Sequence, residues 1–148
     1  MFEKGSFALS SRFGVTPTQI FVKSPIQLLS FLTCDGVHVD PITGKQTILG
    51  VFSNLRAAKF PAVHPRMIWF LSITDVPVGK HQLKVTMGLA IEEPKTIIDR
   101  EFESRNPAHR LNLVNDIQKL KFDKPGDYTI NIEIDDQSLL VTTFSITQ

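Results

Sequence analysis

Apolar and polar residues alternate most regularly near the end of the chain. From residue 128 to residue 135, every second side chain is apolar and those between are polar or charged. A period of two is typical of a strand with one face on a core and the other in water. Residues 124–127 and 135–138 are rich in residues that favour turns. Residues 120–147 therefore predict a β-hairpin that forms one wall of the core.

Further short apolar segments, separated by turn residues, precede this hairpin. Residues 81–92 alternate almost as regularly, and residues 96–103 carry charges that favour an edge strand. Residues 26–34 are apolar at both parities, which predicts a strand with both faces covered. The remaining predicted strands are 46–55, 66–74 and 110–114.

The connections between these strands contain their own signals. Residues 35–45 predict the loop of a long hairpin, and Gly50 in the returning strand predicts a bulge or a close backbone approach. Residues 60–65 contain two prolines, which remove two ladder donors, so this segment is predicted to cross from one sheet to the other.

One segment departs from the extended pattern. Leu113, Ile117 and Leu120 lie at nearly helical spacing, so residues 115–119 predict at most one short helical turn. No amphipathic helix of ten residues lies between strands, which argues against a parallel sheet. The expected fold class is all-β, an antiparallel β-sandwich of about seven to nine strands.

The start of the closing hairpin is similar to a corner of immunoglobulin-like domains, where a tyrosine bonds back to upstream backbone. Gly126 and Tyr128 would form this corner, with Ile130 in place of a cysteine and Trp69 as the core indole. The expected sandwich is therefore immunoglobulin-like, without the disulfide between the sheets.

Residues 26–148 also resemble, over their whole length, a family of uncharacterised bacterial proteins with an immunoglobulin-like β-sandwich. The motifs that carry the resemblance are CD at 34–35, GK at 44–45, ILGVF at 48–52, FPAVHP at 60–65, GKH at 79–81, F at 122 and GDY at 126–128. The resemblance implies the fold for residues 25–148 and no activity, catalytic residue or cofactor.

The first 24 residues show no regular period and depart from the family pattern. They predict either a flexible extension that touches the domain through a phenylalanine, or an added edge strand around residues 18–23. Such a strand would pair with a sheet edge of its own or a neighbouring subunit.

Composition limits the partners. Sixteen basic and fifteen acidic residues give a net charge of +1, which lacks the basic footprint expected for nucleic acid or anionic lipid. The single cysteine, Cys34, excludes an internal disulfide. No apolar run predicts a membrane span or a secretory signal, so a cytoplasmic protein is expected.

Few residues suggest chemistry. His38 and Asp40 would share a face of the 35–45 hairpin, but metal sites usually need three or four ligands, so no metal is expected. Cys34 ends an apolar strand and is expected to be buried and inert. No catalytic motif or cofactor-binding motif is found in the sequence.

Histidines give weaker signals. His64 and Arg66 could form a small patch for an anion or partner, but the pattern favours a histidine bonded to backbone in an irregular, proline-rich segment. His81 and His109 precede predicted strands and are expected to be solvated.

Two functions remain open. One is a non-catalytic binding or assembly module that uses loop ends, a sheet edge and the N-terminal tail, with a protein partner or a second copy of the chain. The other is a small-ligand or metal-binding protein, or an enzyme, that uses the 34–40 hairpin with His64.

Overall fold

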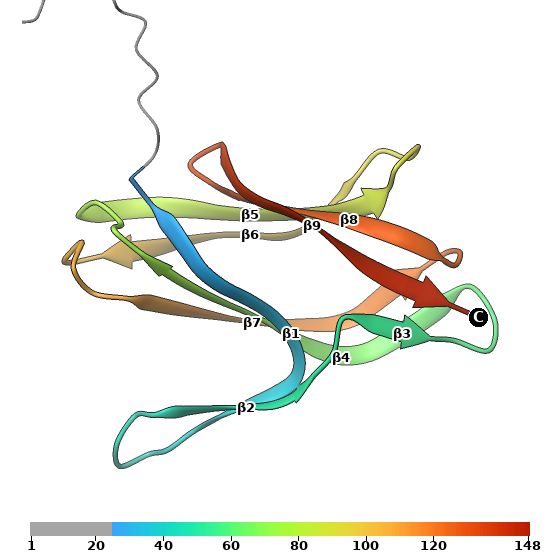
Figure 1. Cartoon of the computed structure of the whole chain (residues 1–148), viewed down its shortest axis with the longest axis horizontal. Helices are drawn as coiled ribbons and strands as arrows, with labels where there is room; N and C mark the ends of the chain where they lie inside the picture. The colour runs from blue at the N-terminus through green and yellow to red at the C-terminus, as the bar shows by residue number, and fades with distance from the viewer. Residues whose placement is uncertain (1–24) are drawn as a thin grey trace, which may run out of the picture.

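The computed structural model describes residues 25–148, and both predictions for residues 1–24 lie outside this part of the chain. The described residues form nine strands and no helix, which confirms the all-β class (Figure 1). The strands are β1 (Gln27–Val39), β2 (Gln46–Val51), β3 (Asn54–Arg56), β4 (Ala62–Thr74), β5 (Gly79–Leu89), β6 (Lys95–Ser104), β7 (Leu111–Phe122), β8 (Gly126–Ile134) and β9 (Gln137–Thr147).

These strands form two sheets that lie one above the other in Figure 1. The four-stranded sheet has the order β2-β1-β4-β7, and the five-stranded sheet has the order β3-β9-β8-β5-β6. Neighbouring strands are antiparallel except β3 and β9, which are parallel. The hairpin predicted within residues 120–147 is β8–β9, and the charged strand expected at an edge is β6.

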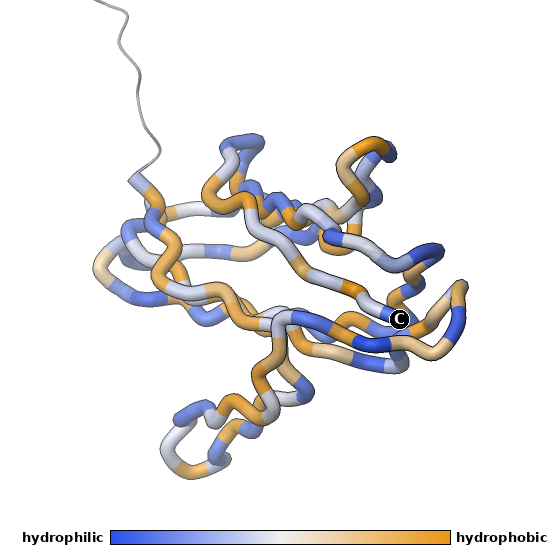
Figure 2. Tube along the Cα trace, turned by 45° about the vertical axis from the view of Figure 1, so that its right-hand side comes forward, coloured by the Kyte–Doolittle hydropathy of each residue, from blue (hydrophilic) through white to orange (hydrophobic). Residues whose placement is uncertain are grey.

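The main core lies between the sheets because both contribute their alternating apolar positions to it (Figure 2). The inward positions of one central strand from each sheet are Met67, Trp69, Leu71 and Ile73 in β4, and Tyr128, Ile130, Ile132 and Ile134 in β8. The regular alternation of β8 therefore arises because one face of this strand lies against the core, as the sequence predicted.

The predicted helical turn at 115–119 is wrong, because these residues lie within β7. Leu113 and Ile117 share the inward face of an extended strand. Lys119 has a positive φ of 55°, which changes the parity of the strand and turns Leu120 inward. A strand with this irregularity produces the same spacing as one turn of helix.

The crossover predicted for residues 60–65 is too long, because β4 already begins at Ala62 and contains Pro65. The chain does pass from the five-stranded to the four-stranded sheet between β3 and β4. Pro65 is tolerated inside the strand because β1 pairs with β4 only from Ile68 to Thr74. The N–H that proline lacks is therefore not needed for a hydrogen bond to β1.

The hairpin loop predicted for residues 35–45 is shorter than expected, since β1 continues to Val39. Two backbone hydrogen bonds of 2.8 Å, from Asp40 to Lys45 and from Gly44 to Asp40, close the turn. Gly50 has a positive φ of 65°, and a Cβ there would clash with the Asp35 carboxylate. A close approach does occur at Gly50, but the approaching group is the Asp35 side chain and not the predicted backbone.

A smaller buried group lies on the other face of the four-stranded sheet. Cys34, Ile68 and Phe70 are buried but do not belong to the main core. The β1–β2 hairpin bends away from the body (Figure 2), and Asn112 Nδ2 of β7 donates a 2.9 Å hydrogen bond to Gln46 Oε1 of this hairpin. Burial raises the pKa of the Cys34 thiol, which disfavours the reactive thiolate.

Tyr128 anchors the start of β8. Its ring packs edge-on against Phe122 at 5.2 Å, and its Oη donates a 2.6 Å hydrogen bond to the carbonyl oxygen of Lys124. Gly126, two residues earlier, has a positive φ of 148°. The hydroxyl thereby links β8 to the turn that precedes it.

We expect Tyr128→Phe to lower the free energy of unfolding by about 1 kcal/mol, because it removes one hydrogen bond and keeps the packing. Urea unfolding measures the difference. A Tyr128→Ala variant should lose considerably more, since it also removes the buried ring. Equal stability of Tyr128→Phe and the wild type would show that the hydroxyl has no anchoring role.

Candidate functional site

Within residues 25–148, the two sheets leave parts of two strand edges unpaired on the same side of the molecule (Figure 1). On this side, β1 pairs with β2 only from Cys34 onward. On the same side, β9 pairs with β3 only at residues 145–147. Residues 27–33 of β1 and 137–144 of β9 thus pair with no described strand along these edges. We call the opening between them the seam.

Backbone groups along both edges point into the seam. Phe52 donates a 2.9 Å hydrogen bond to the carbonyl of Thr33, and Ser145 donates one of 3.4 Å to the carbonyl of Ser53. Because alternate residues of a strand point their N–H and C=O to the same side, the backbone groups of Phe31 and Val141 also point into the seam. Each edge is therefore ready to pair with another extended segment.

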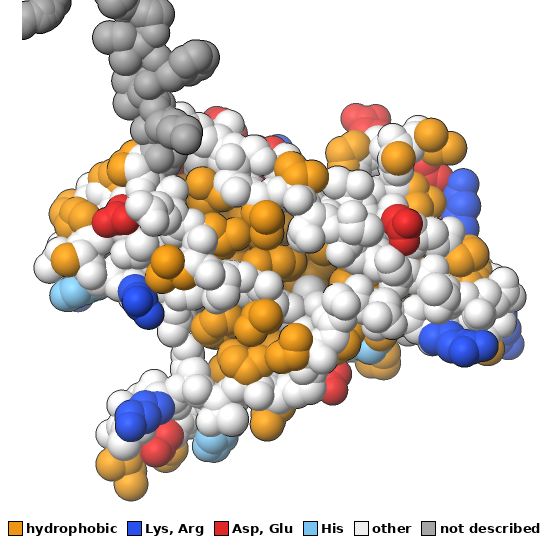
Figure 3. Space-filling view, in the orientation of Figure 1, with side chains coloured by type: hydrophobic (Ala, Val, Ile, Leu, Met, Phe, Trp, Pro, Cys, Tyr) orange, Lys and Arg blue, Asp and Glu red, His pale blue; other side chains and the backbone are white. Residues whose placement is uncertain are grey.

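The seam is lined mainly by apolar side chains. It contains a hollow of about 140 Å³ whose walls include Phe31 and Phe144. Val51, which is 58% exposed, lines the hollow, and the exposed side chains of Leu29 (44%) and Val141 (62%) lie on the two unpaired strand segments. Figure 3 shows hydrophobic side chains gathered in a hollow on this face, between β1 and β9. A strand placed here would bury apolar surface and also gain backbone hydrogen bonds.

Other contacts close the molecule around the seam. At one end, Phe52 packs against Phe144, with ring centroids 5.9 Å apart. On the opposite side of the core, Arg100 of β6 donates a 2.8 Å hydrogen bond to Asn115 of β7. Asn115 in turn donates to the carbonyl of Trp69. The hydrogen bond from Arg100 to Asn115 thus links β6 to β7, the outer strands of the two sheets on that side.

The weak metal candidates lie on the β1–β2 hairpin. His38 is exposed in β1, and Asp40 begins the turn, where its Oδ1 accepts a 2.9 Å hydrogen bond from the Ile42 amide. This bond, together with one from Thr43, lowers the pKa of Asp40. Among residues 25–148, no three His, Cys, Asp or Glu side chains converge to hold a metal ion.

The structure does not bring His64 and Arg66 together. His64 lies beside Phe52, with ring centroids 5.9 Å apart, near the closed end of the seam. Arg66 Nε instead contacts both carboxylate oxygens of Asp116 at 3.0 Å on the outer face. This ion pair raises the pKa of Arg66 and lowers that of Asp116.

His81 was expected to be solvated, but its side chain is only 10% exposed. Nδ1 lies 2.6 Å from Asp135 Oδ2, and Nε2 lies 2.7 Å from the carbonyl oxygen of Pro77. The imidazole stacks on Phe102 at 5.6 Å. Because both ring nitrogens face acceptor oxygens, this geometry favours the doubly protonated ring.

The pKa of His81 reflects opposing effects. Burial lowers it, but the hydrogen bonds to Asp135 and Pro77 raise it more, so it lies above the ordinary value of 6.5. Burial raises the pKa of Asp135, yet the bonds from His81 and the Gln82 amide bring it below its ordinary value. The partners are 54 residues apart in sequence, and no local signal predicts their contact.

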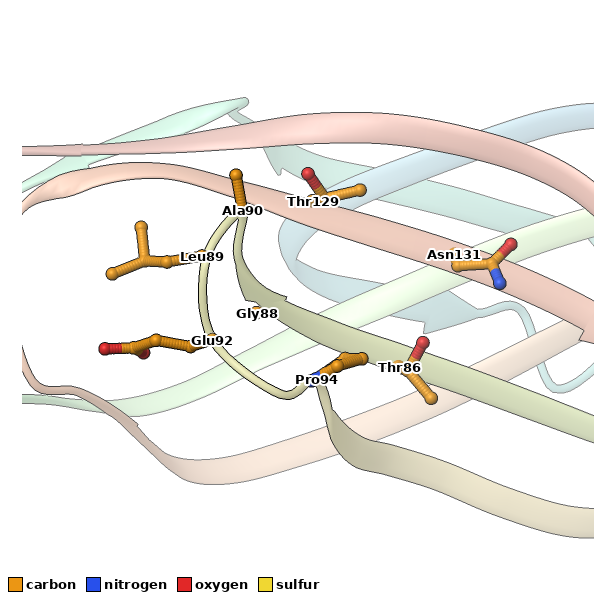
Figure 4. A pocket seen from close by; sticks show the side chains of 8 residues that line it. All are labelled: Thr86, Gly88, Leu89, Ala90, Glu92, Pro94, Thr129 and Asn131. Atoms are coloured by element: carbon orange, nitrogen blue, oxygen red, sulfur yellow. The ribbon is translucent and has the colours of Figure 1, made fainter.

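A second hollow, of about 370 Å³, lies on the outer face of the five-stranded sheet (Figure 4). Thr86, Thr129 and Asn131 point into it from β5 and β8. Pro94 forms part of the rim, and its Cα would lie 2.9 Å from a Cβ at Gly88. Leu89 and Ala90 also line it, and Glu92 is the single charged side chain, so the hollow contains no charge cluster.

Among the described residues, no helix has the length and apolar character needed to cross a membrane. No curated protein matches the chain in sequence. The strand arrangement is similar to part of the alkylpurine DNA glycosylase AlkC of Pseudomonas fluorescens, solved with DNA containing an abasic site analog. The TM-score is 0.50 at 8% sequence identity, and the similarity covers 86% of this chain but 32% of AlkC.

This similarity shows the fold alone, because the chain spans about a third of the length of AlkC and the sequences differ almost throughout. A match at the level of sequence comes from a protein family. Residues 29–147, which include all but the first two residues of the seam, match a family of unknown function. The chain therefore belongs to this family, DUF6941.

Proposed function

We propose that the protein is a non-catalytic binding or assembly module that takes an extended protein segment into the seam as an added strand. The observation that carries the proposal is the pair of unpaired edges on β1 and β9 beside an apolar hollow. Main-chain hydrogen bonds would supply affinity, and the apolar walls would select alternating side chains.

The partner's chemistry follows from the lining. The lining residues Phe31, Val51 and Phe144 are apolar, which suits a segment with apolar residues at every second position. The net charge of +1 gives no basic surface for phosphates, so the similarity to part of a DNA glycosylase does not lead us to propose DNA binding. We propose a protein partner or another copy of the chain.

The finer descriptions of the fold and location belong to the same proposal. The Tyr128–Lys124 hydrogen bond supports an immunoglobulin-like sandwich, since a tyrosine corner of this kind marks many such domains. The near-neutral charge and a single buried cysteine fit a bacterial protein that acts in the cytoplasm, without nucleic acid or membrane as partner.

A phage-displayed library of nonapeptides, selected against the full chain, tests the function. We expect enriched peptides to alternate apolar and polar residues. Their affinity should fall at least about tenfold for a Leu29→Lys, Val141→Lys double variant, because a lysine on each edge segment disfavours the addition of a strand. Both positions are exposed, so the free energy of unfolding should change by no more than about 0.5 kcal/mol per site.

The matched control is a Val78→Lys, Ile91→Lys double variant. Its two side chains, 67% and 92% exposed, lie outside the seam, and it adds the same charge. It should bind the selected peptides as the wild type does. Peptides that bind both double variants and the wild type equally well would refute the seam as the binding site.

A further inference from the structure

We infer that residues 18–23 of the same chain (TQIFVK) are the resident occupant of the seam, paired with the unpaired edge of β1. This inference rests on the proposed function, and it adds that a partner must displace a tethered strand. The segment lies outside the described residues, and only Ser24, Pro25 and Ile26 separate it from β1.

The length of this connection favours a hairpin. Three residues between Lys23 and Gln27 are enough for a β-hairpin loop, and the fixed φ of Pro25 suits a turn. The segment would then run antiparallel to β1. Six residues extend for about 20 Å, which matches the unpaired edge over Gln27–Thr33. A tethered segment this close has an effective concentration near the millimolar range, whereas a partner must be supplied from solution.

The side-chain pattern of the segment also fits. With a period of two, Thr18, Ile20 and Val22 share one face, and Gln19, Phe21 and Lys23 share the other. An added strand at this edge continues the four-stranded sheet, so one of its faces points to the core beside Phe31 and the other points outward. Placing Ile20 and Val22 inward buries this β-branched pair and leaves Gln19, Phe21 and Lys23 on the outer face.

The amide of Phe31 reports on this pairing in the full chain. Its N–H points into the seam and has no partner among the described strands. If the segment pairs with β1, hydrogen exchange at Phe31 should be slow in the wild type. Ile20→Asp, which places a charge against the core, should increase this exchange at least about a hundredfold. Gln19→Asp adds a charge on the outer face and should leave exchange unchanged.

Peptide affinity gives a second readout on the same variants. The probe is a synthetic peptide with the sequence of residues 17–24. We expect the Ile20→Asp full chain to bind it at least about tenfold more tightly than the wild type or Gln19→Asp does, because the competing strand is released. Light scattering should show a monomer for all three proteins, since the strand comes from the same chain.

The alternatives have distinct outcomes. Fast exchange at Phe31 in the wild type, or slow exchange that survives Ile20→Asp, would overturn the inference. A wild-type dimer that dissociates in Ile20→Asp would also overturn it, because the strand would then come from a second copy. If library peptides bind the seam equally in the wild type and Ile20→Asp, the tethered occupant is wrong but the proposed function stands. If no library peptide binds any variant, while the 17–24 peptide binds Ile20→Asp and Phe31 is protected only when Ile20 is present, the seam takes its own strand and the proposed binding of a separate partner fails.

Discussion

Trp69→Ala is expected to lower the free energy of unfolding by about 3–5 kcal/mol, a large part of the stability of a domain of this size. Trp69 is buried at the centre of β4, and its indole meets the ring of Phe31 edge-on at 6.0 Å. Its Nε1 also lies 2.9 Å from Met67 Sδ. Truncation leaves a cavity between the two sheets that the surrounding strands cannot close, because their backbone pairing holds them apart.

Urea unfolding followed by circular dichroism measures this loss. Val63→Ala is the matched control, because Val63 lies on the same strand but is 56% exposed. This variant should change the free energy of unfolding by no more than about 0.5 kcal/mol. Similar losses for Trp69→Ala and Val63→Ala would show that the core is not centred between the sheets.

The His81–Asp135 pair is expected to make stability depend on pH. The raised pKa of His81 means that its contribution is complete below the unfolded pKa of about 6.5 and is lost as the pH rises through the folded value. The lowered pKa of Asp135 means that its contribution is present above about 3.8 and is lost as the pH falls through the folded value. The pair therefore stabilises most between about pH 4 and pH 6.

We expect the stability advantage of the wild type over His81→Gln to fall by about 1–2 kcal/mol between pH 6 and pH 9. Loss of the imidazolium leaves an unprotonated nitrogen against an acceptor oxygen. The value is modest because Asp135 is half exposed and solvent screens the pair. Urea unfolding at several pH values gives both curves, and their difference removes the contribution of other titrating groups.

His109→Gln controls for the loss of a histidine as such. His109 is exposed, and its Nε2 lies 3.5 Å from Asn106 Nδ2, a contact that does not require a charged ring. The advantage of the wild type over His81→Gln should change more between pH 6 and pH 9 than its advantage over His109→Gln. Equal changes for the two variants would mean that the contact of His81 with Asp135 does not make stability depend on pH.

Local patterns predicted the parts of the fold that depend on neighbours in sequence. The alternation from Tyr128 to Ile134 predicted a strand with one buried face, and the charges of residues 96–103 predicted an edge. Both predictions are confirmed, because successive side chains of a strand point to opposite faces and the sequence therefore shows which face is apolar. The turn at residues 40–45 is similarly local.

The errors occur where tertiary pairing changed the meaning of a local signal. The spacing of Leu113, Ile117 and Leu120 suggested a helical turn, but pairing of β7 with β4 holds this segment extended. Pro65 argued against a strand, yet it lies where β1 does not pair with β4. In both cases the conformation depends on which strands pair with the segment at that position. These partner strands are distant in the sequence, so the local pattern does not reveal them.

The sequence alone determined which side chains are buried along most strands, because alternation follows from the geometry of an extended chain. The order of the strands, the seam and the contact between His81 and Asp135 were decided only by the tertiary structure. An edge is unpaired only when no other strand lies beside it, and β1 and β9 are brought to one side by connections that span most of the chain. Such relations between distant segments arise from packing both sheets onto one core, not from any local pattern.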